Sequence, residues 1–201
     1  MKSPLMAIGG FASQISREMP PGNLNLKKLD IIIQETDRME HLVRDMLDFG
    51  RPLVLHPAKV DLNELIREIV DLAQAVAGTA GVALRTHLEP HLPDLFLDKQ
   101  RFKQALLNLI VNAIQASEEG NDVWIKIFTA GEKISLEVID CGCGLKSEDE
   151  KNIFLPFFST KKKGTGLGLG IVKKIVEAHG YEICFLHNDG EGVTFKISIT
   201  I

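Results

Sequence analysis

The sequence has few aromatic residues and no excess of positive charge. Its 201 residues include one Trp and one Tyr, and the formal net charge at pH 7 is -4. Proteins that bind nucleic acids usually carry a basic surface, and those that bind single strands stack aromatic side chains on the bases. We therefore expect no nucleic-acid partner.

Cysteine is also scarce, and long apolar stretches are missing. Cys141, Cys143 and Cys184 form an odd set without the paired spacing of a disulfide scaffold, which favours a reducing compartment. The sequence contains no cleavable signal peptide and no apolar run of about 18 residues, the length that would cross a membrane. We expect a cytoplasmic protein, with membrane attachment, if any, through regions outside this chain.

The N-terminal segment shows the spacing of two amphipathic helices. Apolar residues recur every three or four positions in residues 3–19 and again in residues 24–50, and Pro20-Pro21-Gly22-Asn23 forms a turn signal between them. A single hairpin cannot cover both apolar stripes. We expect a homodimer in which two hairpins form a four-helix bundle, and the alternative is that the helices pack on the rest of this chain.

The prolines of residues 51–57, RPLVLHP, predict an extended linker between two domains, residues 1–52 and 53–201. In the second domain, helices are expected at residues 62–78 and 99–120, with a third ending at His179. Strands are expected at residues 82–88, 94–97, 123–130, 133–140, 181–187 and 193–201. Helices mixed with antiparallel strands predict a two-layer α/β sandwich, so the fold class of the whole chain is α+β.

Residues 161–170, KKKGTGLGLG, place alternating glycines just before the third helix of this domain. A helix N-terminus has unpaired N–H groups and a partial positive charge, and glycines let a phosphate approach the backbone closely. The lysines precede the glycines, unlike the lysine of a P-loop, and no buried strand leads into them, unlike a dinucleotide fingerprint. A flexible loop is the alternative to a phosphate site.

Two further polar groups suit a nucleotide. Asn108 and Asn112 lie one turn apart and share a face of the 99–120 helix, and amide oxygens are suitable ligands for Mg²⁺. Asp140 follows a predicted strand and precedes Gly142 and Gly144, so its carboxylate can accept a hydrogen bond from an exocyclic amine beside bare backbone. The alternatives are a pair of surface amides and a turn that begins at Asp140.

These elements, in this order, resemble the ATP-binding domain of sensor histidine kinases. The matching segments are residues 108–113 (NLIVNA), 140–144 (DCGCG), 154–158 (FLPFF), 164–169 (GTGLGL) and 190–195 (GEGVTF). Residues 2–12 (KSPLMAIGGFA) resemble the helix that follows the phosphoacceptor histidine, and the resemblance is greatest to kinases of the nitrogen-regulation type. It implies half of a dimeric four-helix bundle followed by the ATP-binding sandwich shared with topoisomerases and heat-shock chaperones.

The resemblance implies a role for each matching residue. Asn108 and Asn112 would hold Mg²⁺, and Asp140 would recognise the adenine amine. A mobile lid would extend from about residue 145 to 163, anchored or docked through Phe154, Phe157 and Phe158. The expected ATP-binding residues are Asn108, Asn112, Asp140, Gly142, Gly144, Lys161, Gly164, Thr165, Gly166, Leu167, Gly168 and Thr194.

The resemblance also implies an activity and its partners. A histidine kinase uses Mg-ATP to phosphorylate a histidine, and an aspartate of a response regulator then takes the phosphoryl group. Only the tail of the phosphoacceptor motif, Ser3-Pro4-Leu5, is present. The histidine would lie just before Met1, so we expect this chain alone to bind ATP without phosphorylating itself. The alternative function is a nucleotide-binding interaction module without phosphotransfer.

Ser3 is a further candidate. By resemblance, its hydroxyl would orient a water that dephosphorylates a response regulator. Helix capping before Pro4 is the alternative role for this residue.

Overall fold

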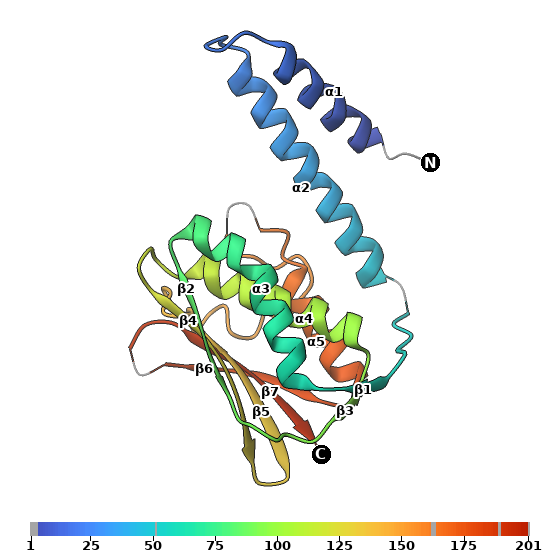
Figure 1. The fold of residues 1–201 in the computed structure, drawn as a ribbon, viewed down its shortest axis with the longest axis vertical. Helices are drawn as coiled ribbons and strands as arrows, with labels where there is room; N and C mark the ends of the chain where they lie inside the picture. The colour runs from blue at the N-terminus through green and yellow to red at the C-terminus, as the bar shows by residue number, and fades with distance from the viewer. Residues whose placement is uncertain (1–3, 51, 162–163, 189, 201) are drawn as a thin grey trace. The chain divides into compact units, whose positions relative to one another are not determined.

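The structure is a computed structural model that describes residues 4–50, 52–161, 164–188 and 190–200, apart from the side chains of His41, Arg44, Asp45 and Asp48. The chain divides into two compact units, Met1–Arg51 and Pro52–Ile201 (Figure 1). No helix among the described residues is both long enough and apolar enough to cross a membrane.

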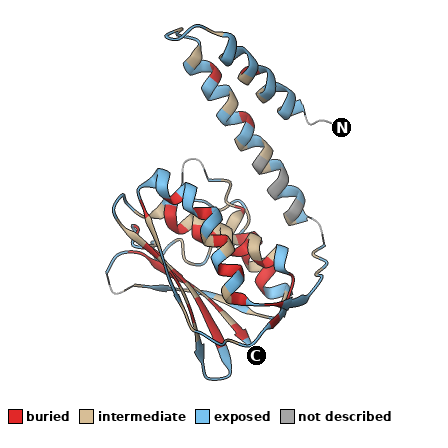
Figure 2. Ribbon diagram, in the orientation of Figure 1, coloured by how far each residue is buried: buried red, intermediate tan, exposed pale blue. Residues whose placement is uncertain are grey.

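The first unit is a hairpin of helices α1 (Pro4–Glu18) and α2 (Leu26–Gly50). The helices pack closely where Gly9 faces Thr36, since a Cβ at Gly9 would lie 3.3 Å from the Cγ2 atom of Thr36. Ala12, Leu29 and Thr36 are buried in this contact. Much of both helices is exposed, as their pale blue in Figure 2 shows, and many of the exposed residues are apolar. The exposed apolar residues are Met6, Ile8, Phe11, Ile15, Leu24, Ile31, Ile32, Met39, Val43, Met46 and Leu47.

The second unit is an α/β sandwich. Its elements are β1 (Ala58–Val60), α3 (Leu62–Ala80), β2 (Ala83–Leu88), β3 (Leu95–Leu97), α4 (Lys99–Ala116), β4 (Asp122–Ala130), β5 (Lys133–Ile139), α5 (Gly168–Ala178), β6 (Glu182–His187) and β7 (Val193–Thr200). The main sheet has the strand order β2-β4-β5-β7-β6, and α3, α4 and α5 cover one of its faces (Figure 1). The predicted class, a helical hairpin followed by a two-layer sandwich, is confirmed.

The core lies between the helices and the covered face of the sheet. Val123, Ile125 and Ile127 of β4 are fully buried and the residues between them are not, because side chains alternate between the two faces of a strand. The helices contribute their apolar faces, with Leu106 and Leu109 of α4 fully buried. The red parts of the sandwich in Figure 2 follow this interface.

Two features of the sheets differ from the prediction. The sequence predicted antiparallel strands, but β2 pairs with β4 in parallel. The chain passes through β3 and α4 between these strands, and such a crossover returns the second strand in the same direction as the first. In addition, residues 58–60, to which the sequence assigned no strand, form β1 and pair with β3 in a separate two-stranded sheet.

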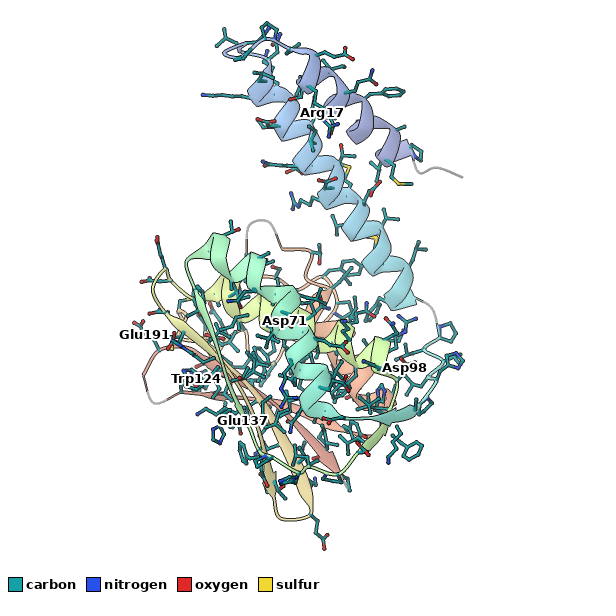
Figure 3. The ribbon with its side chains drawn as sticks, in the orientation of Figure 1. Arg17, Asp71, Asp98, Trp124, Glu137 and Glu191 are labelled. Atoms are coloured by element: carbon teal, nitrogen blue, oxygen red, sulfur yellow. The ribbon has the colours of Figure 1, made fainter. Side chains whose placement is uncertain are left out.

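Helix α4 is fixed at its beginning by Asp98, which Figure 3 labels. Asp98 Oδ1 accepts a hydrogen bond from Arg101 N at 3.0 Å, as an N-cap residue does, and Oδ2 accepts one from His56 N at 2.9 Å. The Asp98 N–H donates to Nε2 of His179 at 3.0 Å. Asp98 thereby connects the start of α4 with the end of α5. Helix α4 ends at Ala116, earlier than predicted, because Ser117 is extended.

Candidate functional site

The end of α4 brings three of the sequence motifs together. A Cβ at Gly142 would lie 2.8 Å from the carbonyl carbon of Ala116, the last residue of α4. A Cβ at Gly168, the first residue of α5, would lie 3.7 Å from Nδ2 of Asn112. The loop after β5 and the N-terminus of α5 therefore both lie against the last turns of α4.

Asp140 is buried at the end of β5, with 4% of its surface exposed. Its Oδ1 atom accepts hydrogen bonds from the N–H groups of Gly142 at 2.9 Å and Val193 at 3.2 Å. Burial raises the pKa of the Asp140 carboxyl, against the opposing effect of these two bonds and of the charge on Lys161. Both side-chain bonds that described residues make to Asp140 engage Oδ1, so Oδ2 is left as an acceptor.

Gly142 and Gly192 keep the backbone around Asp140 tightly packed. Gly142 has no room for a side chain against Ala116, and a Cβ at Gly192 would lie 2.8 Å from the carbonyl carbon of Asp140. Gly192 also has a φ of +99°, a backbone conformation that favours glycine. Gly144 has a φ of +73°, and a Cβ there would meet the backbone of Gly192 only at an ordinary contact distance of 3.9 Å. Of the two glycines predicted after Asp140, Gly142 is required by packing and Gly144 by backbone conformation.

Asn108 and Asn112 lie on one half-buried face of α4, between residues that pack into the core. Asn112 is close to the start of α5 through its Nδ2 atom and to Lys161 through its Oδ1 atom. No described residue forms a hydrogen bond with the side chain of Asn108. The structure thus brings Asn112 into contact with two other predicted site residues and leaves the amide of Asn108 available on the same face.

Lys161 reaches across to the last turns of α4. Its Nζ atom donates to Oε1 of Gln115 at 3.1 Å, to the carbonyl of Asn112 at 3.4 Å and to Oδ1 of Asn112 at 3.5 Å. The residue is exposed as a whole, but its ammonium lies among protein atoms. This burial lowers the pKa of Lys161, against the opposing attraction of Asp140 and Cys143. Lys162 and Lys163 lie outside the described residues.

Helix α5 begins without a side-chain cap among the described residues. Leu167 is the N-cap residue and is fully buried, and its N–H is bonded to Oγ1 of Thr165 at 3.3 Å. The first intrahelical bond runs from Ile171 N to Leu167 O at 2.9 Å. The N–H groups of Gly168, Leu169 and Gly170 precede that bond, so they have no partner within the helix.

The glycines that lead into α5 are fixed by close contacts. Gly166 has a φ of +69°, and a Cβ there would lie 2.7 Å from the carbonyl oxygen of Phe157. A Cβ at Gly164 would collide with the hydroxyl of Ser159. Glycine is therefore required at both of these described positions by the close approach of neighbouring atoms.

The segment from 145 to 161 contains hydrogen-bonded turns and no regular helix among its described residues. Phe154 anchors it to the sandwich, with its ring edge-on to Phe195 at 6.4 Å and Lys173 Nζ 5.6 Å from its centroid. Phe157 is 62% exposed and has a φ of +67°. Of the phenylalanines predicted to hold this segment, Phe154 packs on the sandwich and Phe157 is presented to solvent.

Thr194 is the predicted residue that stands apart from the others. It pairs with Ile139 of β5 and Leu186 of β6. The next pair, Val138 and Phe195, points to the face that the helices cover, so the side chain of Thr194 points to the opposite face. The Thr194 hydroxyl donates to Oδ1 of Asn188 at 2.6 Å. The Asn188 amide in turn donates to the carbonyl of Asp140 at 2.8 Å. Thr194 is therefore connected to Asp140 through Asn188.

Sequence reasoning missed Asn188 and Gln115 as members of this cluster. Asn188 lies between the strands expected at residues 181–187 and 193–201, and nothing in the sequence indicated that its side chain would bond to the Asp140 carbonyl. Gln115 follows Asn112 by three residues and so lies on the same side of α4. That spacing could be read from the sequence, but the bond between Gln115 and Lys161 could not. Ser3, the remaining candidate, lies outside the described residues.

Comparison with known families gives two matches. The family described as histidine kinase-, DNA gyrase B- and HSP90-like ATPase matches residues 97–201. The His Kinase A (phospho-acceptor) domain matches residues 1–52.

Relatives match over the whole chain. It is 33% identical to the sensor histidine kinase ZraS of Escherichia coli (strain K12) over 201 residues, which are 100% of this chain and 43% of ZraS. It is 32% identical to the signal transduction histidine-protein kinase AtoS of the same strain over 202 residues, covering 100% of this chain and 33% of AtoS. The chain thus spans less than half the length of these relatives.

Two solved structures extend the similarity to the fold. Histidine kinase ThkA, in complex with the response regulator protein TrrA, matches with a TM-score of 0.77 and 30% identity over 99% of this chain and 58% of that chain. Full-length ShkA in complex with AMPPNP matches with a TM-score of 0.81 and 25% identity, over 98% of this chain and 43% of that chain. The resemblance predicted from the sequence motifs is confirmed: this chain belongs to the family of histidine kinase-, DNA gyrase B- and HSP90-like ATPases and is homologous to sensor histidine kinases.

Proposed function

We propose that this chain is the catalytic core of a two-component sensor histidine kinase and that it binds Mg-ATP at the end of α4. The observation that carries the proposal is the meeting of Asn112, Lys161 and Gly168 at one place, with Asp140 at the end of the adjoining strand. These groups come from three separate motifs. Their convergence supplies a buried carboxylate, a cation and free backbone N–H groups within one site.

The adenine end of the site is formed by Asp140. The carboxylate has Oδ2 free to accept a hydrogen bond from the exocyclic amine of adenine, and the bonds to Oδ1 hold it in place. Gly142 and Gly144 leave the adjoining backbone bare for the flat ring. Thr194 acts indirectly, since its hydroxyl donates to the side chain of Asn188, and the Asn188 amide donates to the Asp140 carbonyl. Guanine carries a carbonyl where adenine carries the amine, so the site favours ATP over GTP.

The phosphate end is formed by the start of α5 and by Lys161. The N–H groups of Gly168, Leu169 and Gly170, which have no partner within the helix, and the helix dipole together attract a polyphosphate. The turn that orients these N–H groups consists of Gly164, Thr165, Gly166 and Leu167. Lys161 contributes the positive charge.

Mg²⁺ fits the residues on the half-buried face of α4 that carries Asn108 and Asn112. The amide oxygens of Asn108 and Asn112 are hard ligands of the kind that this ion takes together with water and phosphate oxygens. Oδ1 of Asn112 already accepts a cationic group, the Lys161 ammonium at 3.5 Å, which supports its use for a metal ion. When bound, the ion neutralises phosphate charge, and the two amides of this chain orient it.

The partners follow from the N-terminal hairpin and from the relatives. We propose that the chain is a homodimer through α1 and α2, because their exposed apolar stripes are those that a second hairpin would cover. A response regulator is the proposed acceptor of the phosphoryl group, and the relative ThkA has been solved in complex with one. The phosphatase role of Ser3 stays a prediction of the sequence.

Calorimetry tests this function on the chain as it is. Titration with AMPPNP in magnesium buffer is expected to give saturable binding with one site per chain, and the GTP analogue is expected to bind at least tenfold more weakly. Transfer is tested separately, by supplying a His-Glu pair ahead of Met1 and following label from ATP. A folded dimer of that extended chain that binds ATP and stays unlabelled would contradict the kinase assignment and favour an interaction module.

A further inference from the structure

The position of Lys161 sets a condition on how the site is filled. Its ammonium donates to Oδ1 of Asn112, the same oxygen that is proposed to face Mg²⁺, and to the Asn112 carbonyl. A lysine and a divalent cation at one amide oxygen repel each other, and the repulsion is strong because the ammonium is partly removed from water. Lys161 must therefore leave Asn112 when the metal arrives.

Gln115 provides the shortest of the three contacts that keep the ammonium there, at 3.1 Å. Gln115 lies one turn beyond Asn112 on α4, so the side-chain amide oxygens of the two residues face the same side of the helix. Gln115 is neutral and exposed, and its bond to the ammonium is weaker than the bond that a carboxylate would form. Such an acceptor holds the lysine without fixing it permanently.

We propose that Gln115 is a positioning residue that holds the Lys161 ammonium at Asn112 in the nucleotide-free chain, so that Lys161 and the divalent cation compete for the Asn112 amide oxygen. The metal enters as Lys161 moves from α4 toward the phosphates at the start of α5. This inference rests on the proposed function and adds to it the residue that sets the metal requirement.

The test removes the acceptor and keeps the shape of the side chain. Gln115→Met has nearly the same length and helix propensity as the native residue. The AMPPNP affinity of the full chain is measured by calorimetry over a series of magnesium concentrations and in EDTA. The variant is expected to reach half of the magnesium-dependent gain at a magnesium concentration about threefold lower than the native chain, the size expected for one exposed charge-assisted hydrogen bond. Affinity in EDTA is expected to be unchanged.

Two further chains complete the design. Gln74→Met is the matched control, since Gln74 is an exposed helical glutamine whose side chain has no hydrogen bond among the described residues. It is expected to behave as the native chain. In a Lys161→Met background, Gln115→Met is expected to change the magnesium midpoint no further, because the competing ammonium is gone.

The outcomes separate this inference from the function on which it rests. A native chain that binds no AMPPNP overturns both. A native chain that binds AMPPNP with a clear magnesium requirement supports the function, and an unchanged midpoint in Gln115→Met then overturns the role of Gln115. An equal change in EDTA and in magnesium would assign Gln115 a structural effect and would also overturn it.

Discussion

At the scale of single residues, the buried carboxylate of Asp140 costs stability. Its carboxylate is buried, and burial raises its pKa above the value in the unfolded chain. The protonated carboxyl contributes fully to the free energy of unfolding below the ordinary Asp pKa of about 3.9. This contribution is lost as pH rises through the raised pKa of Asp140 in the folded chain. At neutral pH the ionised group therefore lowers the free energy of unfolding, which suggests that the charge is retained for a ligand.

Replacing Asp140 with Asn tests this directly. The variant is expected to lose AMPPNP affinity by a hundredfold or more, because Asn offers one acceptor in place of two. At pH 7 it is expected to unfold at the same urea concentration as the native chain or at a higher one, and the advantage should disappear near pH 4, at about the ordinary pKa. Urea titrations at both pH values check the sign. If the difference in stability between the variant and the native chain were less favourable to the variant at pH 7 than at pH 4, the pKa of Asp140 would not be raised in the folded chain.

Gly142 makes the second prediction at this scale. A Cβ there would press on the backbone of Ala116, which cannot move without disturbing the end of α4. Gly142→Ala is expected to lower the free energy of unfolding by about 1–3 kcal/mol and to weaken nucleotide binding. Gly78→Ala is the matched control, since Gly78 lies in α3 with open space around it, and should gain about 0.5–1 kcal/mol. Equal urea midpoints for the two variants would contradict the packing at Gly142.

At the scale of the elements, His179 joins two helices that are far apart in the sequence. Its Nε2 atom accepts from the Asp98 N–H, and Nδ1 therefore carries the proton that is donated to Ile175 O at 2.7 Å. Its ring stacks on Tyr181 with centroids 5.9 Å apart. The histidine thereby keeps the beginning of α4 beside the end of α5, and with it the opposite ends of these helices, which form the proposed site, stay together.

His179→Ala is expected to lower the free energy of unfolding by about 2 kcal/mol, because it leaves the Asp98 N–H without its acceptor and opens a cavity. His87→Ala, on the exposed side of β2, is expected to stay within about 0.5 kcal/mol of the native value. Chemical denaturation of the three chains provides the comparison. If His87→Ala were the more harmful change, the link between α4 and α5 would not be structural.

Most elements could be predicted from local signals, and their pairing could not. Asp61, whose side chain accepts a hydrogen bond from Glu64 N, is the N-cap residue of α3, as Asp98 is of α4. Such caps mark helix starts in the sequence, and the alternating apolar residues of β4 mark a strand. The parallel pairing of β2 with β4 depends on the path of the chain through α4, which no local pattern records. The site divides in the same way. Asp140, Asn112 and the glycines could be proposed from their motifs, whereas the bond from Lys161 to Gln115 and the face on which Thr194 lies depend on distant segments.

At the scale of the whole molecule, the hairpin leaves an apolar stripe for a second copy. Ile32, Met39, Val43 and Met46 recur along α2 and remain 43–51% exposed. Exposed apolar patches of this extent are covered in stable proteins by a partner. Since residues 1–52 match the His Kinase A domain, a second copy of this hairpin is the partner that we propose.

Charged substitutions on this stripe test the dimer. The double variant Met39→Glu/Val43→Glu is expected to sediment as a monomer, while the native chain sediments as a dimer, because each buried carboxylate would lack a partner. AMPPNP affinity is expected to stay within about twofold, since the site lies in the second unit. A dimer that survives both substitutions would remove this stripe from the interface.

Asn112, Gly142 and Gly168 are proposed to line one nucleotide site at the end of α4. This proposal is tested most directly by following the amide NMR signals of the labelled chain during titration with AMPPNP in magnesium buffer. The backbone signals of Gly142 and Gly168 and the side-chain signal of Asn112 are expected to shift together with a single dissociation constant, while the signal of Gly78 is expected to stay in place. Shifts confined to other parts of the chain, or saturating binding that leaves these three signals unchanged, would contradict it.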